Sequence, residues 1–541
     1  MKTLALIFPV LYKKFYINPF HLQKLQSVLF FSLDKIDDEN TCADIVLIDI
    51  NNPAHRKLIE SHDIQFDLCV VDIPEGQLYA TEYVLKNICA DLIVLTGEEI
   101  KYGVASQVYS YLKQFSSQIV MAIDDEDVIT AVIQYLKNGT INCSDNVVIR
   151  SFDTNVLSFS NLKPDFPKWM GSLYDQFGIQ IFMDGISRGC ENNCFFCKLN
   201  NTHLDNHRKK IVDSGIDIIS TIKNICMACE KIPYIQFTDE NFFGRGSGRL
   251  IAIQKLCDGL EQISYNGFLG IDSRLDSVFN PNDSEEIALL RKNTWQRLAK
   301  NGLRYCFFGI ETFSHEQAQR YNKALDLQYF SKVIRFVEDN NIFYTIGLIL
   351  WDPLMSKDDI LTNLSFIKDN NLLGKTASLL KCLRVQVNSQ YAEKYGTRFI
   401  ITPSSCQDGF NLDDSSITYL DKDINSIIPF VRFAYDSLNE HGYRHSDVAL
   451  FEVMFDIETP QILRQIPFLV AKYEYNVLIF LLNCAYVDQQ ERVLFELRNM
   501  VKDLVDRIMG ELEKLSLDYG MNNNTVLEYY NRVFLRVRDS L

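Results

Sequence analysis

The sequence predicts an α/β protein of three parts: an N-terminal Rossmann-like unit with a parallel sheet, a central partial TIM-like (β/α)6 barrel, and a mainly helical C-terminal domain. Two observations support this prediction. Short runs rich in Val and Ile alternate with polar segments of helical length up to about residue 400, which is typical of parallel sheets covered by helices. Beyond that point such runs become rare and apolar residues recur at helical spacing.

A chain of 541 residues is long enough for more than one domain. We expect a Rossmann-like unit over residues 1–150, a linker over 151–178, the barrel over 179–400 and a helical domain over 401–541. Within the linker, two closely spaced prolines favour an extended conformation.

The composition excludes several classes of protein. The formal net charge is −16, whereas proteins that bind nucleic acids generally carry an excess of basic residues, so the composition argues against nucleic-acid binding. The start of the chain lacks the pattern of a secretory signal, and its most apolar run, 477–482, is too short to span a bilayer. Fourteen cysteines are too dilute for a disulfide scaffold, so we expect a cytoplasmic protein with free thiols and no membrane partner.

The N-terminal unit contains five short apolar runs that we interpret as parallel strands. They are Leu4–Val10, Ile45–Ile50, Leu68–Ile73, Leu92–Thr96 and Ile119–Ile123. Acidic residues end several of these runs, where open α/β sheets bind ligands. These acids are Asp49, Asp72, Asp124 and Asp125. The absence of a glycine-rich phosphate loop after these runs argues against a dinucleotide site.

Three cysteines, Cys190, Cys194 and Cys197, follow the predicted first barrel strand at C-x3-C-x2-C spacing. Thiolates so close together can face one metal centre, although a zinc site or an iron–sulfur cluster normally takes four protein ligands. Three ligands on a four-iron cluster leave one iron open. The alternatives are structural cysteines or a zinc knuckle completed by a distant residue.

This spacing, with Phe196 before the last cysteine, resembles the radical S-adenosylmethionine (SAM) superfamily. The resemblance implies a [4Fe-4S] cluster on the three cysteines, with SAM bound at the open iron and Phe196 beside it. It also implies an electron donor such as flavodoxin or ferredoxin. One electron from the cluster cleaves SAM to methionine and a 5′-deoxyadenosyl radical in this superfamily.

Three further segments support the same resemblance. The run that ends in Asp239, Glu240 and Asn241 is similar to the cobalamin-type branch of the superfamily, where it meets the SAM ammonium; a helix cap is the alternative. Ser273 and Arg274 follow the next strand and would lie near the SAM carboxylate and ribose; for Arg274 a surface ion pair is the alternative.

The third segment resembles the family's fourth strand. Gly309-Ile-Glu311-Thr is followed by Asn322-Lys323, and the resemblance implies that Glu311 contacts the ribose or the amino acid part of SAM. The sequence predicts a helix over 210–223 and a last barrel strand over 380–387.

Before such a barrel, the N-terminal unit resembles the cobalamin-binding domain of the same branch. Many such domains carry Asp-x-His-x-x-Gly after the first strand, but here the nearest histidine, His21, lacks that pattern. Two alternatives stay open: cobalamin binding, or a degenerate domain that packs, covers the site or binds substrate.

The resemblance implies an enzyme that abstracts hydrogen from a small metabolite or peptide in natural-product biosynthesis. With cobalamin, the expected outcome is methyl transfer; without it, a rearrangement, cyclisation or oxidation. The alternative from another class is a non-catalytic iron–sulfur electron carrier. The sequence identifies no catalytic acid, base or second hydrogen donor.

Overall fold

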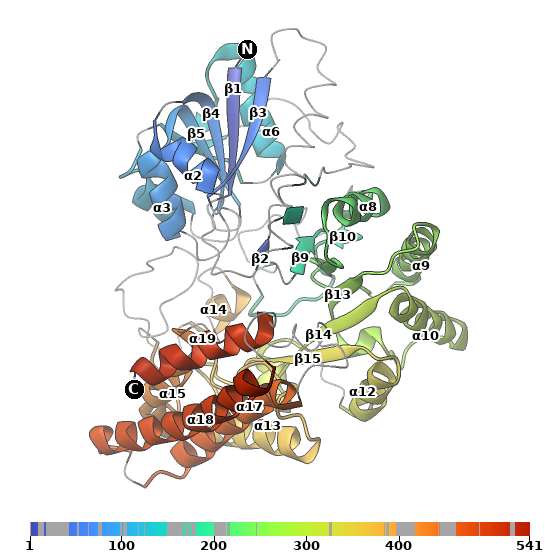
Figure 1. The fold of residues 1–541 in the computed structure, drawn as a ribbon, viewed down its shortest axis with the longest axis vertical. Helices are drawn as coiled ribbons and strands as arrows, with labels where there is room; N and C mark the ends of the chain where they lie inside the picture. Colours follow the sequence, from blue (N-terminus) through green and yellow to red (C-terminus); the bar gives the residue numbers. More distant parts are fainter. Residues whose placement is uncertain are drawn as a thin grey trace.

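A computed structural model describes most of the chain (Figure 1). The described residues are 2–8, 16–17, 43–50, 53–62, 64–73, 78–97, 100, 105–116, 118–123, 125–148, 166, 168, 171–172, 175, 180–197, 199, 212–213, 217–244, 246–323, 327–383, 385, 389–396, 417–441, 443, 461–485, 487–519 and 525–540. The fold is mixed α/β with two parallel sheets and a helical C-terminal part, as predicted.

The N-terminal sheet has seven strands in the order β3-β1-β4-β5-β6-β8-β7. The strands are β1 (Lys2–Phe8), β3 (Ala43–Asp49), β4 (Gln65–Asp72), β5 (Cys89–Thr96), β6 (Ile119–Met121), β7 (Cys143–Ser144) and β8 (Val147–Val148). The five predicted strands are all present and pair in parallel. The antiparallel β7–β8 pair at the edge was not predicted.

Alternation along these strands divides the core of the unit between the two faces of the sheet. Ile7, Val71 and Leu95 belong to one apolar cluster, together with residues of helices on that face. Leu6 and Val70 belong to another, which packs against α6. The helices of the unit are α2 (Pro53–Glu60), α3 (Leu78–Asn87), α5 (Ala105–Leu112) and α6 (Asp125–Asn138).

The second sheet has six parallel strands in the order β15-β14-β13-β12-β9-β2. Its strands are β2 (Tyr16–Ile17), β9 (Gln180–Met183), β12 (Tyr234–Phe237), β13 (Phe268–Ser273), β14 (Leu303–Glu311) and β15 (Phe343–Leu348). The helices that alternate with them are α8 (Ile218–Ala228), α9 (Ser247–Gln262), α10 (Glu285–Lys300), α11 (His315–Arg320), α12 (Phe330–Asp339) and α13 (Lys357–Asp369), with the short helix η4 (Leu275–Ser277) after β13.

One strand of the barrel sheet comes from the N-terminal region. In β2, Tyr16 and Ile17 pair with Gln180 and Ile181 of β9. This dipeptide falls within residues 1–150 of the predicted N-terminal unit, and the structure places it on the edge of the second sheet (Figure 1). The two α/β parts are therefore joined by backbone pairing as well as by the chain.

The predicted helix over 210–223 begins later than the sequence suggested. Val212 and Asp213 form β11, which pairs with β10 (Ser187–Arg188), and α8 begins after Asp217. The side chain of Asp217 accepts a hydrogen bond from the Ser220 backbone N–H at 3.0 Å, which caps the helix. The predicted helix began too early because apolar residues at helical spacing also precede this capping residue.

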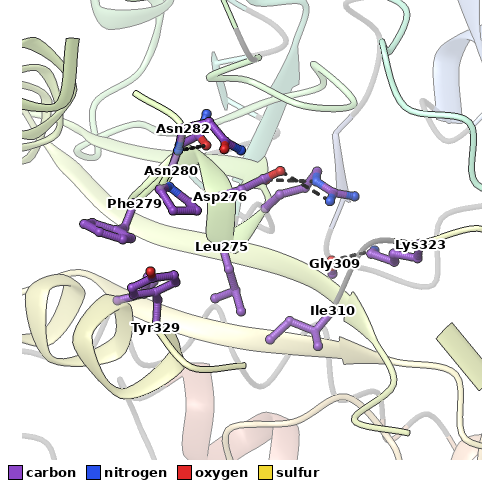
Figure 2. Close-up of a pocket in the computed structure, with 12 residues that line it drawn as sticks. Leu275, Asp276, Phe279, Asn280, Asn282, Gly309, Ile310, Lys323 and Tyr329 are labelled. Atoms are coloured by element: carbon purple, nitrogen blue, oxygen red, sulfur yellow. Dashed lines mark hydrogen bonds and ion pairs between the residues drawn. The ribbon is translucent and has the colours of Figure 1, made fainter. Parts of the chain in front are cut away.

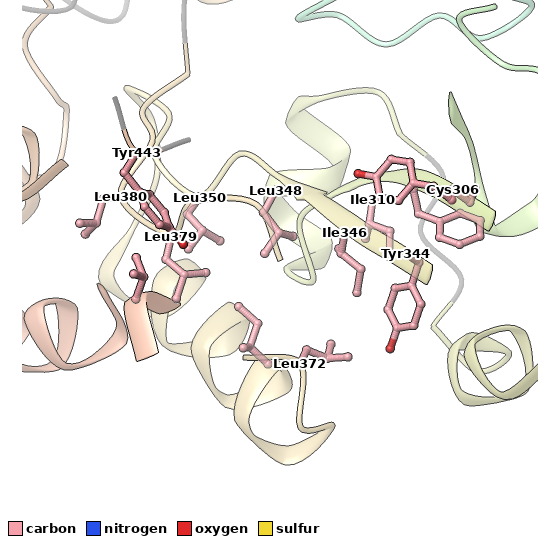
Figure 3. Packing of buried hydrophobic residues seen from close by; sticks show 14 of the residues in the cluster. Cys306, Ile310, Tyr344, Ile346, Leu348, Leu350, Leu372, Leu379, Leu380 and Tyr443 are labelled. Carbon is pink, nitrogen blue, oxygen red and sulfur yellow. The ribbon is translucent and has the colours of Figure 1, made fainter. Parts of the chain in front are cut away.

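The segment predicted as the last barrel strand pairs at one point within its described residues, where a parallel bridge joins Trp351 to Cys382. The C-terminal helices are α14 (Gln390–Tyr395), α15 (Lys422–Asn439), α17 (Gln461–Leu482), α18 (Gln490–Tyr519) and α19 (Thr525–Ser540). They share one apolar core with the barrel, so strand residues such as Ile346 and Leu348 and the more distant Tyr443 belong to a single cluster (Figure 3).

A buried acid on α17 connects the helical part to the barrel. Both oxygens of Glu474 accept hydrogen bonds, from Ser378 Oγ at 2.7 Å and from the Leu379 N–H at 2.9 Å. None of the helices in the described part of the chain has the length and apolar character needed to cross a membrane.

Candidate active site

The three cysteines lie on the segment that follows β9 and β10, which we call the cysteine loop (residues 190–197). Cys194 is buried, and Cys190 and Cys197 are partly buried. The Cys197 N–H donates to the Cys194 carbonyl at 3.1 Å, and Asn192 Nδ2 donates to the Cys190 sulfur at 3.1 Å. Backbone and side-chain contacts thus keep the three thiols on one compact loop.

Burial raises the pKa of Cys190, while the backbone and side chain of Asn192 act in the opposite direction. In the described part of the chain, three His, Cys, Asp or Glu side chains nowhere converge as ligands of one metal ion. A four-iron cluster makes no such demand, because its thiolate ligands bind separate irons.

The residues after β12 hold the segment that leads into the cysteine loop. Asp239 Oδ1 accepts a hydrogen bond from the Ser187 N–H at 2.7 Å, and Glu240 accepts one from the Gly189 N–H at 2.9 Å. These three predicted SAM contacts, Asp239, Glu240 and Asn241, therefore also position the loop. Asn241 Nδ2 donates to Glu191 Oε1 at 2.9 Å.

Two acceptor atoms at this junction suit a bound cation. Among the described residues, Asp239 Oδ2 and Asn241 Oδ1 are buried and lack a hydrogen-bond partner. Burial raises the pKa of Asp239 to about 7. The hydrogen bond from the Ser187 N–H and the Arg249 guanidinium, 3.5 Å away, act in the opposite direction and lower this pKa. An ammonium group is a donor that would satisfy such acceptors.

Ser273 and Arg274 stand at the end of β13 but point to different partners. Ser273 is buried, and its hydroxyl forms a hydrogen bond of 2.6 Å with the hydroxyl of Ser277 in η4. Arg274 Nε pairs with Asp276 at 3.0 Å. Burial lowers the pKa of Arg274, but nearby Asp276 and the thiols of the cysteine loop outweigh it and raise the pKa.

Glu311 ends β14 in an unusual backbone conformation, with φ at 71°. Such left-handed geometry is rare for residues other than Gly, Asn and Asp, and it recurs at functional sites. The Glu311 carboxylate pairs with Lys323 Nζ at 3.1 Å, and Lys323 also donates to the Gly309 carbonyl at 2.6 Å. A Cβ at Gly309 would lie 2.8 Å from Glu311 Oε1, so glycine leaves room for this carboxylate.

A pocket of about 240 Å³ opens beside these residues, over the ends of β13 and β14 (Figure 2). Figure 2 shows the Lys323 amine directed at Gly309. Sequence reasoning missed most of the lining, because it comes from the η4 loop and α12. The lining residues are Arg274, Leu275, Asp276, Phe279, Asn280, Pro281, Asn282, Gly309, Ile310, Lys323, Tyr329 and Val333.

Phe196 does not line this pocket. Its ring packs edge-on against Tyr321, with the ring centroids 5.1 Å apart. His21, the histidine nearest to the expected position of the cobalamin motif, lies outside the described part of the chain.

In the N-terminal sheet, Asp72 is buried at the carboxyl end of β4. Gly97 follows β5 with φ at 97°, and a Cβ there would lie 2.3 Å from Asp72 Oδ1. Glycine therefore allows the β5 connection to pass close to this acid at the edge where open α/β sheets bind ligands.

No family model matches the chain. A solved structure of the cobalamin-dependent S-adenosylmethionine radical enzyme OxsB, with aqua-cobalamin and S-adenosylmethionine bound, is similar with a TM-score of 0.69 at 16% identity, over 100% of this chain and 84% of that chain. The radical S-adenosylmethionine methyltransferase TsrM from Kitasatospora setae, with cobalamin and a [4Fe-4S] cluster bound, gives 0.54 at 11% identity, over 74% of this chain and 78% of that chain.

A curated relative, 4′-phospho-dehydrooxetanocin synthase from Priestia megaterium, is 28% identical over 193 residues, or 35% of this chain and 26% of the relative. The match spans about a quarter of the relative's length. At these identities the solved structures establish the fold. The chain has the fold of cobalamin-dependent radical SAM enzymes, including the N-terminal sheet, and the resemblance predicted from the sequence is confirmed at that level.

Proposed function

We propose that this chain, which has the fold of cobalamin-dependent radical SAM enzymes, is itself a radical SAM enzyme acting on a small molecule. One observation carries the proposal: the cysteine loop lies against the residues that follow β12, where Asn241 Nδ2 donates to Glu191 Oε1 at 2.9 Å. A reduced four-iron cluster with SAM would supply a 5′-deoxyadenosyl radical for hydrogen abstraction.

In this proposal Cys190, Cys194 and Cys197 bind three irons of the cluster. Asp239 and Asn241 accept hydrogen bonds from the SAM ammonium, because each has a buried acceptor without a partner among the described residues. This role adds to their contacts with the loop, since those contacts use other atoms of the same side chains.

Arg274 and Glu311 would bind the remaining polar groups of SAM. Arg274 offers a guanidinium to the carboxylate, and Glu311 accepts hydrogen bonds from ribose hydroxyls. Lys323 holds the Glu311 carboxylate in place, so we assign it a positioning role. The barrel strands and the C-terminal helices share one apolar core, and exclusion of water from the site during the reaction would protect a radical from side reactions.

The N-terminal sheet would hold cobalamin at its carboxyl edge, near Asp72 and Gly97. The OxsB and TsrM structures that support this were solved with cobalamin bound. A bound cobalamin would favour methyl transfer to carbon. Without it, the same barrel would suit a rearrangement, cyclisation or oxidation. The relative from Priestia megaterium is named 4′-phospho-dehydrooxetanocin synthase.

Anaerobic reconstitution tests the proposal. The protein is loaded with iron and sulfide, mixed with SAM and dithionite, and assayed for 5′-deoxyadenosine with and without hydroxocobalamin. We expect 5′-deoxyadenosine from the wild type and none from Cys194→Ala. Retained cobalamin together with S-adenosylhomocysteine would favour methyl transfer. An intact cluster that neither binds nor cleaves SAM would contradict the proposal and favour an electron carrier.

A further inference from the structure

Two segments that lie far from the cysteine loop in the sequence hold the backbone of this loop. The Phe195 N–H donates to the Tyr321 carbonyl at 2.9 Å, and the Tyr391 N–H donates to the Phe195 carbonyl at 2.9 Å. Phe195 follows Cys194 directly. Both hydrogen-bonding groups of this one residue are therefore fixed from outside the loop.

Side chains from the same two segments add further contacts. Asn322 Nδ2 donates to the Asn193 carbonyl at 2.7 Å, and Gln390 Nε2 donates to Asn193 Oδ1 at 3.1 Å. The Phe196 ring packs against Tyr321, and the Lys394 amine lies 4.6 Å from the centre of the Phe195 ring. The segment between the first and last cysteines thus rests on residues 321–322 and 390–394.

These two segments meet on a single carboxylate. Tyr391 Oη donates to Asp352 Oδ1 at 2.7 Å. Tyr321 Oη lies 3.3 Å from Asp352 Oδ2 and shares its proton between this oxygen and the Ile349 carbonyl at 3.2 Å. Asp352 follows β15 and is fully buried. The residues whose backbones hold Phe195 are the residues whose hydroxyls bind this acid.

The charge of Asp352 is compensated inside the protein. Oδ2 also accepts from Gln317 Nε2 at 2.9 Å and from Arg320 at 3.0 Å, and Oδ1 accepts from the Leu354 N–H at 3.0 Å. Arg320 pairs with Asp359 as well, at 2.9 Å. Five donors thus hold this buried carboxylate in one orientation, and removing it would leave several buried donors without an acceptor.

We propose that Asp352 is a positioning residue for the cysteine loop: it orients Tyr321 and Tyr391, and their backbones fix the loop between Cys194 and Cys197. The inference rests on the proposed function in one respect, namely that these cysteines bind a cluster. The effect of Asp352 on the conformation of the loop can be measured in the metal-free protein.

The test uses the full-length metal-free protein under reducing, anaerobic conditions. Hydrogen exchange of peptides covering residues 190–197 and the rate of iodoacetamide alkylation of the three cysteines are compared for wild type, Asp352→Asn and Tyr391→Phe. The matched control is Asp283→Asn. The Asp283 side chain is 7% exposed and its carboxylate pairs with Arg291 at 2.7 Å, in the segment between η4 and α10.

We expect Asp352→Asn to speed exchange and alkylation in the loop by roughly tenfold, the effect of losing one hydrogen bond of ordinary strength, and Tyr391→Phe to do so to a smaller extent. Asp283→Asn should lower the melting temperature without changing the loop. If Asp352→Asn does not fold, Tyr391→Phe alone decides. Loop rates equal to wild type in a folded Tyr391→Phe or Asp352→Asn protein would overturn the proposal.

A second measurement separates this inference from the proposed function. The same variants are reconstituted with iron and sulfide, and the cluster is followed by its electron paramagnetic resonance spectrum after reduction. We expect an altered spectrum or faster cluster loss in Asp352→Asn, and a wild-type spectrum in Asp283→Asn. A loosened loop in variants of a protein that never binds a cluster would sink the proposed function and leave the positioning role standing.

Discussion

Replacing Gly185 by alanine should displace Asp239 and so weaken its hydrogen bond to the segment that leads into the cysteine loop. Gly185 lies between β9 and β10, and a Cβ there would meet Asp239 Oδ2 at 2.0 Å and Phe237 Cδ1 at 3.2 Å. Its φ is not among the positive values in the chain, so an alanine backbone fits and the side-chain collision alone decides the result.

The size of the effect follows from the contacts of Asp239. Ordinary contact begins at 3.4 Å, so the carboxylate or the chain must move by about 1.4 Å. The hydrogen bond from the Ser187 N–H, 2.7 Å long, and the ion pair with Arg249 have no room for such a shift. Strain and the loss of this buried bond together should cost about 2–4 kcal/mol of unfolding free energy.

Thermal unfolding and hydrogen exchange at residues 186–190 measure the effect. Gly248→Ala is the matched control, because a Cβ there would have no neighbour within 4 Å. A double-mutant cycle with Asp239→Ala tests the cause, since removal of the carboxylate should make the methyl group tolerable. Wild-type stability in Gly185→Ala, or a destabilisation unchanged by Asp239→Ala, would refute the reasoning.

Two further predictions concern the site. Glu311→Gln should weaken SAM binding by roughly tenfold, because the variant loses a charged acceptor and leaves Lys323 without its carboxylate; calorimetry on the reconstituted protein would show this, and unchanged affinity would remove Glu311 from the site. Burial, aided by nearby Glu240, raises the pKa of Asp272 to about 7, so the folded protein holds a proton that the unfolded chain releases above about 4. The free energy of unfolding should therefore fall as pH rises towards 7, by up to about 1.4 kcal/mol per pH unit from this group, and this slope should decrease in Asp272→Asn. Thermal unfolding of the metal-free wild type and variant from pH 5 to 8 measures the slopes. Equal slopes in the two proteins would count against a buried proton on Asp272.

The parts of the fold that the sequence predicted well depend on short-range patterns. Apolar runs with polar flanks located the five predicted parallel strands of the N-terminal sheet, and apolar residues at helical spacing predicted helices beyond residue 400. The cysteines could be found because all three lie within eight residues. Their role as cluster ligands, like the domain boundaries, stays a prediction.

The parts that could not be predicted depend on contacts between distant segments. Nothing near Asp352 in the sequence indicates that it contacts Tyr321 and Tyr391 at once, since about 30 to 40 residues separate it from each of them. The left-handed conformation of Glu311 is equally invisible, because a glutamate rarely adopts it. Acids at the end of β12 were expected near SAM, but not as acceptors for the backbone before the cysteines.

The pairing of Tyr16 and Ile17 with β9 affects how the protein can be made and divided. A fragment beginning at residue 179 would leave the outer edge of β9 unpaired, and exposed strand edges invite aggregation. During translation β2 leaves the ribosome long before β9, so this edge closes late, through a contact of large sequence separation. Expression of the barrel alone is therefore expected to yield aggregation-prone protein unless the N-terminal segment is supplied with it.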